Sequence, residues 1–310
     1  MKALILGHRG QDGTLLAEHL MRAGHEVVGV SRDGPIDICD ARAVADFVGA
    51  ERPDHVYHLA AFHHAAEEAP GGSGALFVRS YETHVLSLVH FLEAIRAVSP
   101  STRLFYAASS LIFGRPEAPV QDERSPIAPD SVYGITKAAG LLTCRHYRHE
   151  HGLFAAAGIL YNHESWLRAP SFVSRKIVVA AVAIAAGRRR EKLVVGELAA
   201  ATDWGFAPDF VDAFQRILDA PRPDDFIVAT GSAHTVRDFV AAAFAAVGLD
   251  WRNHVEERPG LLVRKPAARV GDARRLGEVT GWRPRVSFEE MVRLLVEREL
   301  VSGGKSDSRS

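Results

Sequence analysis

Three glycines near the N-terminus limit the fold of this chain more than any other feature. In "LILGHRGQDGTLLAEHL", Gly7, Gly10 and Gly13 lie between a short apolar run and an amphipathic segment. Glycine permits a tight turn there, and it lets the backbone approach a diphosphate whose charge the amides at a helix N-terminus then meet. The loop predicts a dinucleotide-binding strand-turn-helix unit, although a plain glycine-rich turn has the same spacing.

Apolar runs and amphipathic stretches alternate over the first half of the chain. Continuous apolar strands separated by helices form a parallel sheet that helices cover on both faces. We therefore expect an α/β fold with a Rossmann-type, doubly wound parallel sheet. The expected strands cover residues 3–7, 26–31, 55–61, 103–109 and 154–162, and the expected helices cover residues 14–23, 41–49, 81–98 and 132–151.

The second half has shorter, mixed elements, which predict a smaller mixed α/β C-terminal lobe that binds the substrate. The tail "SGGKSDSRS" has no apolar residue, so we expect it to be disordered. The expected boundaries are residues 1–163 for the dinucleotide-binding domain, with a later contribution near 200–216, residues 164–301 for the lobe, and residues 302–310 for the tail.

The charge balance excludes some classes of partner. The chain has 37 Lys and Arg against 38 Asp and Glu, so no overall field attracts nucleic acid or an anionic membrane. No apolar run is long enough to span a bilayer. Cys39 and Cys144 make no disulfide framework and match no metal pattern, so we expect two small buried residues in a cytoplasmic protein without a metal site.

The end of the second expected strand bears on the choice between NAD and NADP. An acidic side chain there binds the ribose hydroxyls of NAD and repels a 2′-phosphate. This chain has Ser31 and Arg32, and Arg9 lies in the glycine loop, so NADP(H) is favoured over NAD(H). Asp33 weighs against that reading, and both arginines also suit a solvated surface. Asp37 is expected either at the adenine edge or as an ordinary strand-end cap.

A serine, a tyrosine and a lysine form the expected catalytic set. The stretch "SVYGITKAAG" places Tyr133 and Lys137 four residues apart at a helix start, so both lie on one face. We expect the charge of the lysine to lower the pKa of the phenol, which can then exchange a proton with a sugar or alcohol oxygen. Ser109 lies at the end of an expected strand, which strengthens the pattern.

Blocks along nearly the whole chain resemble the extended short-chain dehydrogenase/reductases that modify nucleotide sugars, and in particular GDP-mannose 4,6-dehydratases. The resemblance implies a Rossmann domain with a sugar-nucleotide lobe, a bound nicotinamide, and a Ser/Thr-Tyr-Lys triad that falls on Ser109, Tyr133 and Lys137. Lys137 and Tyr133 would also contact the cofactor. The blocks include "GQDGTLLAEHL", "FYAASSLIFG", "YGITKAAG", "GILYNHES", "FVSRKI", "DWGFAPDFV" and "GDARRLGEVTGWRP".

The chain departs from those dehydratases in its catalytic serine stretch. They resemble T-x-E over this span, and the glutamate removes the C5 proton, whereas this chain has Leu111. Elimination would therefore need another base, for which His63, His64 and His163 at strand ends are candidates, although a histidine there is more simply a hydrogen-bonded residue. The loop "GHRG" resembles GDP-fucose synthases, which reduce a 4-keto sugar with NADPH, and the arginine-rich insertion after the second strand is missing.

The resemblance also implies a nucleoside diphosphate sugar as the substrate. Asn162 and Ser165 in "YNHES" match the family's diphosphate contact, and Ser110 lies beside the catalytic serine. Arg175 suits a phosphate or an ion pair at a helix start, and Arg264 resembles a late arginine that often clamps the diphosphate. The inference to guanine is weakened because family residues are replaced at Leu167, Pro170 and Thr202.

These observations predict an NADP-dependent enzyme that acts at C4 of a hexose, by reducing a 4-keto-6-deoxy sugar or by epimerising C4. The alternatives are a GDP-mannose 4,6-dehydratase with a substitute base and a non-catalytic NADP-binding protein. The family also implies a homodimer formed through the helices at residues 81–98 and 132–151.

Overall fold

The computed structural model describes residues 1–62, 73–260 and 268–306 of the chain. Six parallel strands form its main sheet in the order β2-β1-β3-β4-β6-β10. The chain leaves β1 toward one edge and returns to its other side at β3, so the direction of winding reverses between these two strands. The strands are β1 (Lys2–Leu6), β2 (Glu26–Val30), β3 (His55–His58), β4 (Arg103–Ser109), β6 (Ala155–Leu160) and β10 (Asp225–Val228).

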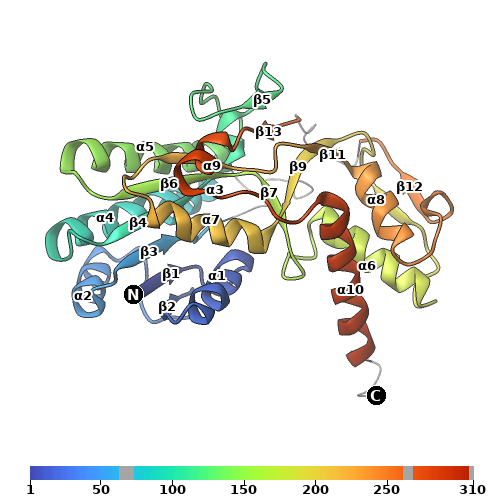
Figure 1. The fold of residues 1–310 in the computed structure, drawn as a ribbon, viewed down its shortest axis with the longest axis horizontal. Helices are drawn as coiled ribbons and strands as arrows, with labels where there is room; N and C mark the ends of the chain where they lie inside the picture. Colours follow the sequence, from blue (N-terminus) through green and yellow to red (C-terminus); the bar gives the residue numbers. More distant parts are fainter. Residues whose placement is uncertain (63–72, 261–267, 307–310) are drawn as a thin grey trace.

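Helices cover both faces of this sheet (Figure 1). Successive side chains of β1 point to opposite faces of the sheet. Leu4 and Leu6 pack into the core on one face, and Ala3 and Ile5 pack into the core on the other. The doubly wound α/β fold expected from the sequence is confirmed. One layer contains α2 (Ala41–Glu51), α4 (Ser87–Val98) and α5 (Val132–His151), and the other contains α1 (Gln11–Arg22), α7 (Ala207–Asp219) and α9 (Arg274–Thr280).

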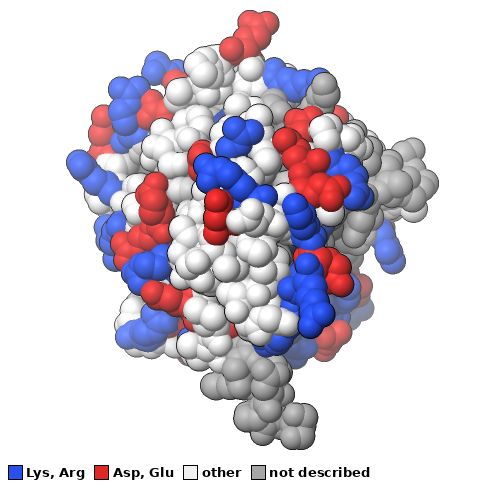
Figure 2. All heavy atoms as spheres, turned by 90° about the vertical axis from the view of Figure 1, so that its right-hand side faces the viewer, with Lys and Arg blue, Asp and Glu red and all other residues white. Residues whose placement is uncertain are grey.

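The smaller lobe has its own core, in which Trp204, Phe239 and Phe288 pack together. On its outer face, charged side chains of both signs surround a strip of uncharged residues (Figure 2). Its elements are α6 (Val173–Ala185), α8 (Val236–Ala245) and α10 (Phe288–Ser306), the pair β8 (Leu193–Val195) and β12 (Val255–Glu257), and the sheet of β7 (Asn162–Glu164), β9 (Ala201–Phe206) and β11 (Ala233–Thr235).

The chain passes between the two cores more than once. The contribution to the main sheet expected near residues 200–216 extends further, because β10 and α9 belong to that sheet and its helix layer. Residues 302–306 of the expected disordered tail lie in α10. Residues 307–310 are outside the described residues.

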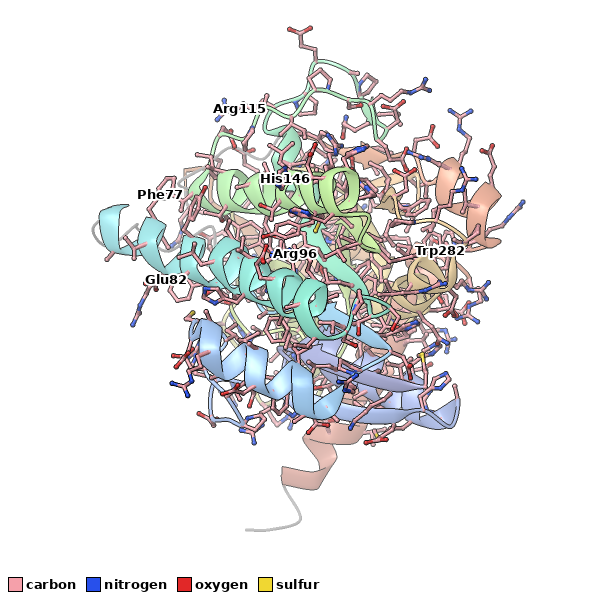
Figure 3. The ribbon with its side chains drawn as sticks, turned by 90° about the vertical axis from the view of Figure 1, so that its left-hand side faces the viewer. Phe77, Glu82, Arg96, Arg115, His146 and Trp282 are labelled. Atoms are coloured by element: carbon pink, nitrogen blue, oxygen red, sulfur yellow. The ribbon has the colours of Figure 1, made fainter. Side chains whose placement is uncertain are left out.

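The expected helix over residues 81–98 is interrupted. It consists of the end of α3 (Ser73–Tyr81), a π-helical turn η1 (Glu82–Leu86) and then α4. Figure 3 shows α2, α4 and α5 side by side, with Phe77 of α3 and Glu82 of η1 at one end of the layer. The other short elements are the 3₁₀ helices η2 (Ser110–Phe113) and η3 (Trp251–Asn253), and the paired strands β5 (Val120–Gln121) and β13 (Val270–Gly271).

The expectation that both cysteines are buried is wrong for Cys39, which is exposed, whereas Cys144 is buried in the core. Cys39 lies in the irregular segment between β2 and α2 at the surface, where its sulfur is 3.9 Å from the carbonyl oxygen of Glu82 in η1. Among the described residues, no helix combines the length and the apolar character that a membrane crossing requires.

Candidate active site

The glycine loop joins β1 to α1 at the point where the winding of the sheet reverses. Gly7 has φ +83°, and a Cβ at that position would lie 3.0 Å from the backbone nitrogen of Ala60, just after β3. A Cβ on Gly13 would lie 2.3 Å from the carbonyl oxygen of Gly7. Gly10 precedes α1 without any side-chain cap, which leaves amides of the first turn for a ligand. These residues fit the diphosphate of a dinucleotide.

The turn after β2 brings the expected ribose-binding residues together. Ser31 pairs with Gly34, and Arg9 of the glycine loop lies 2.8 Å from the carboxylate of Asp33, with both side chains exposed. Arg32 is exposed beside them. Asp37 accepts a hydrogen bond from the backbone N–H of Cys39, which is the local cap that was one of its two expected roles.

Ser109, Tyr133 and Lys137 come from β4 and α5. Helix α5 begins where Ser131 accepts a hydrogen bond from the N–H of Gly134, which places Tyr133 in its first turn. Lys137 is 1% exposed and its Nζ donates to the carbonyl oxygen of Ala107, two residues before Ser109, at 2.7 Å. The lysine therefore holds the helix against the end of the strand that carries the serine.

The turn η2 packs against the first turn of α5. A Cβ on Gly134 would lie 2.6 Å from the carbonyl oxygen of Leu111, so only glycine allows this approach. Ser109 accepts a hydrogen bond from the N–H of Leu111 at 3.2 Å. Within the described residues, the structure gives the Ser109 hydroxyl no acceptor, so its proton can be donated to a substrate oxygen. The backbone of Leu111 thus lies against Ser109 and against the first turn of α5.

Burial has the largest effect on the pKa values of Lys137 and Tyr133, the expected catalytic pair. It lowers the pKa of Lys137 to about 7, against the opposing charge of Asp12. It raises the pKa of Tyr133 above its ordinary value, while Arg168 acts in the opposite direction and Asp12 adds to the rise. The net lowering of the phenol pKa expected from the sequence is wrong for this structure. Tyr133 is therefore protonated near neutral pH and can donate a proton.

His163 forms a partly buried ion pair with Asp12 of α1. Its Nε2 lies 3.0 Å from both carboxylate oxygens of Asp12, and its Nδ1 lies 2.7 Å from the carbonyl oxygen of Tyr161. Carbonyl and carboxylate oxygens only accept, so both ring nitrogens donate and the ring is an imidazolium. Burial opposes this charge, but Asp12 more than offsets it and raises the pKa of His163. A ring with both protons committed in this way is not a base.

This ion pair predicts a pH dependence of stability. The pKa of His163 is raised from 6.5, so its contribution is complete below pH 6.5 and is lost as the pH rises through the folded value. For Asp12, burial raises the pKa but His163 more than offsets it and lowers the pKa from 3.8 to about 2, so its contribution is complete above pH 3.8 and is lost as the pH falls through 2. Asp12→Asn should lower the free energy of unfolding by roughly 1–3 kcal/mol at pH 6.

Urea unfolding from pH 5 to pH 9 would measure this effect. The difference between wild type and Asp12→Asn should shrink as the pH rises above 6.5. Asp33→Asn is the matched control, because Asp33 forms an exposed pair with Arg9 and should change stability by less than about 1 kcal/mol. Equal losses in the two variants at every pH would contradict the ion pair.

The remaining predicted residues are dispersed or already paired. Asn162 is exposed at the start of β7, and Ser110 is buried at the start of η2. Ser165 donates to the side chain of Gln11 at 2.9 Å, and Arg175 forms an ion pair with Glu299 of α10 at 2.6 Å, which was the alternative to a phosphate contact. Three other predicted residues, His63, His64 and Arg264, lie outside the described residues.

Comparisons with known proteins identify the family. The family model described as GDP-mannose 4,6 dehydratase matches residues 34–295. GDP-mannose 4,6 dehydratase 1 of Arabidopsis thaliana is 34% identical over 331 residues, which cover 96% of this chain and 89% of the plant protein. The chain belongs to the GDP-mannose 4,6-dehydratase family. As a member of that family it is an enzyme, which confirms the resemblance and the enzymatic class expected from the sequence.

Solved structures share the fold of this family member. The structure of RMD from Pseudomonas aeruginosa complexed with NADPH has a TM-score of 0.85 at 19% identity, covering 97% of this chain and 100% of that chain. UDP-glucose 4-epimerase of Thermus thermophilus complexed with NAD has a TM-score of 0.81 at 25% identity, covering 96% and 99%.

Sequence reasoning missed several polar contacts in the interior and at its edge in this family member. Gln11 and Asp12 were not predicted, yet they tie the first turn of α1 to Ser165 and His163. Glu164 is 2% exposed and accepts a hydrogen bond from Ser174 at 2.6 Å. The available signal was the placement of two adjacent polar residues in the first turn of a helix that packs on the sheet, where a partly buried polar side chain needs a hydrogen-bond partner.

Proposed function

We propose that this enzyme is a cytoplasmic, NADP(H)-dependent nucleotide-sugar oxidoreductase that acts at C4 of a hexose, most simply by reducing a 4-keto-6-deoxy sugar linked to GDP. Family membership supports a nucleotide sugar as the substrate and a nicotinamide as the cofactor. The observation that carries the choice of reaction is the combination of a protonated Tyr133 with an apolar residue, Leu111, two positions after Ser109.

The residues of this chain suit the reduction of a ketone. When bound, the nicotinamide supplies the hydride for C4. Tyr133 donates its phenolic proton to the C4 oxygen, and the Ser109 hydroxyl donates a hydrogen bond to the same atom. The phenolate that results lies close to Lys137, whose Nζ is 5.7 Å from the centre of the Tyr133 ring and is held by Ala107. Lys137 thus stabilises the product state of the proton transfer.

Elimination of water would need a base for the C5 proton. Leu111 has no group that can accept a proton, and both ring nitrogens of His163 already donate hydrogen bonds. The carboxylate of Glu164 is buried and paired with Ser174 and Arg168. The second candidate is a GDP-mannose 4,6-dehydratase with a base from elsewhere, and the match to the family model over residues 34–295 favours it. Epimerisation at C4 would use the same three catalytic residues.

Two incubations separate these functions. With a GDP-linked 4-keto-6-deoxy sugar, the absorbance of NADPH should fall, and a slower fall with NADH would support the choice of cofactor. With GDP-mannose and no added reductant, a dehydratase would instead release a 4-keto-6-deoxy product. Binding of NADPH without turnover of any sugar nucleotide would leave only the non-catalytic alternative.

Leu111→Glu tests whether this position lacks a required base. We expect the variant to eliminate water from GDP-mannose, whereas wild type and Leu111→Gln should not. Glutamine has the same shape as glutamate but cannot accept the C5 proton. Mass spectrometry of the sugar nucleotide would detect the loss of one water. Elimination by wild type, with little change in Leu111→Glu, would show that a dehydratase uses a substitute base.

Arg9 and Arg32 are proposed to select NADP(H). Replacing both with alanine should lower kcat/KM for NADPH by at least about 10- to 100-fold and leave the value for NADH nearly unchanged, since the loss of even one charged hydrogen bond costs about 1.5–3 kcal/mol. Steady-state kinetics with both cofactors would measure the ratio. Arg22→Ala, at an exposed position in the last turn of α1, is the control. Equal losses with NADPH and NADH would contradict the assignment.

A homodimer through the layer of α4 and α5 remains a proposal. Several apolar side chains of α3, η1 and α5 are exposed next to α4. Figure 3 shows this helix layer from outside. Large exposed apolar patches often mark contacts between proteins. Light scattering of the purified chain would give its mass. The exposed residues are Val78, Tyr81, Leu86, Ile135 and Leu142.

A further inference from the structure

The π-helical turn η1 brings a buried histidine to the catalytic tyrosine. His84 lies in the middle of this turn and is 0% exposed. A π turn contains one more residue than an α turn, which changes the direction of its side chains, and such turns occur often at functional sites. The sequence reasoning assigned no role to His84, and none of the catalytic steps proposed above uses it.

Hydrogen bonds define the protonation of His84. The backbone N–H of Phe62, four residues after β3, lies 2.9 Å from its Nε2, and a backbone N–H can only donate, so Nε2 accepts. Its Nδ1 lies 2.8 Å from the hydroxyl of Thr136. That hydroxyl directs its own proton to the carbonyl oxygens of Val132 and Tyr133, at 3.0 and 3.1 Å. Nδ1 therefore carries the hydrogen and donates it, and the ring is neutral.

The same imidazole contacts the ring of Tyr133. The two ring centres are 5.2 Å apart and the planes meet at 83°, which is an edge-to-face arrangement. Tyr133 is thus held from two sides by one residue, through its aromatic ring and, by way of Thr136, through its own carbonyl group. The chain of bonds runs from the segment after β3, where the glycine loop packs, to the first turn of α5.

We propose that His84 is a positioning residue that fixes the orientation of the Tyr133 phenol and ties it to the segment after β3. The inference rests on the proposed function in that Tyr133 transfers the proton. A small change in the direction of the phenol weakens proton transfer strongly, and displacements of about 1 Å in an active site can lower a rate by about 10²-fold. Binding of substrate and cofactor does not depend on that direction to the same extent.

Two conservative variants test the two hydrogen bonds of His84 separately. An asparagine places its amide where Nδ1 lies and can still donate to Thr136, whereas a glutamine reaches the position of Nε2 and can still accept from Phe62. We expect His84→Ala to lower kcat by about 10- to 100-fold with little change in KM, and Asn or Gln to restore part of it. Thr136→Val should reproduce the loss seen with Gln, because both remove the bond from Nδ1.

A second measurement does not depend on turnover. In protein labelled with ¹³C at the ζ carbon of tyrosine, the Tyr133 resonance is the one missing from Tyr133→Phe. It should shift in His84→Ala and return toward the wild-type position in His84→Asn. His90→Ala is the control, because His90 lies on α4 and contacts the carbonyl oxygen of Ile38 instead.

The outcomes separate the two proposals. If wild type reduces no sugar nucleotide, the proposed function fails, and the resonance of Tyr133 still tests His84. If His84→Ala leaves both kcat and the Tyr133 resonance unchanged, the positioning role is overturned. Shifts of all tyrosine resonances together, with no rescue by Asn or Gln, would show a general loss of packing and would also overturn it.

Discussion

Replacing Tyr133 with phenylalanine should lower kcat by about 10²–10⁴-fold and leave the binding of NADPH nearly unchanged. The substitution removes only the phenolic oxygen, so the ring contact with His84 and the packing of α5 persist. What is lost is the proton that the C4 oxygen receives, and general acid catalysis by a positioned group contributes about this factor. The decrease in NADPH absorbance with a 4-keto sugar nucleotide measures kcat, and fluorescence of bound NADPH measures affinity.

Tyr147→Phe is the matched control for this variant. Tyr147 lies on the same helix and its hydroxyl donates to Glu93 at 2.7 Å, away from the catalytic set. Its loss should lower stability by about 1 kcal/mol and leave kcat unchanged. If Tyr133→Phe kept more than a tenth of the wild-type rate, the proton would have to come from another group, and Tyr133 would not be the acid of the reaction.

Replacing Lys137 with methionine should have two opposite effects. Activity should fall by about 10²–10³-fold, because the phenolate formed in the reaction loses the neighbouring charge. Stability at pH 7 should rise, because the side chain is 1% exposed and burial lowers the pKa of its ammonium group from 10.5 to about 7. Under the proposed function, the buried amine of Lys137 lowers stability but is required for catalysis.

The sign of the pH effect follows from proton binding. Between about pH 7 and 10.5 the unfolded chain holds the proton on Lys137 more tightly than the folded chain does. The contribution of Lys137 to the free energy of unfolding therefore rises with pH over this window, by on the order of 4 kcal/mol. Urea unfolding at pH 7 and pH 9.5 should show this rise in wild type and in Lys192→Met, an exposed control, but not in Lys137→Met. The same rise in all three proteins would contradict the prediction.

Much of the fold could be predicted, and the candidate catalytic residues could be chosen, because the signals for both are local. The spacing of Gly7, Gly10 and Gly13 reflects one turn, and the spacing of Tyr133 and Lys137 reflects one face of one helix. The alternation of apolar runs and amphipathic stretches likewise reflects a sheet with helices on both faces.

Pairing between distant segments could not be predicted in the same way. His163 was considered as a base, but whether its nitrogens are free depends on Asp12, which lies in the first helix. Arg175 suits a phosphate or an ion pair, and only the packing of α10 against α6 supplies Glu299. The direction of the pKa shift of Tyr133 depends on burial, which a spacing of four residues does not reveal.

The position of β10 has a consequence for attempts to shorten the chain. The last strand of the main sheet and helix α7 come after the first segments of the lobe, so a fragment that stops at residue 163 would lack both. Its β6 would become an open edge with unpaired backbone groups, and the apolar face that α7 covers would meet water. Such a fragment should aggregate on expression, and during synthesis the dinucleotide-binding half cannot close until the ribosome has released residues beyond Val228.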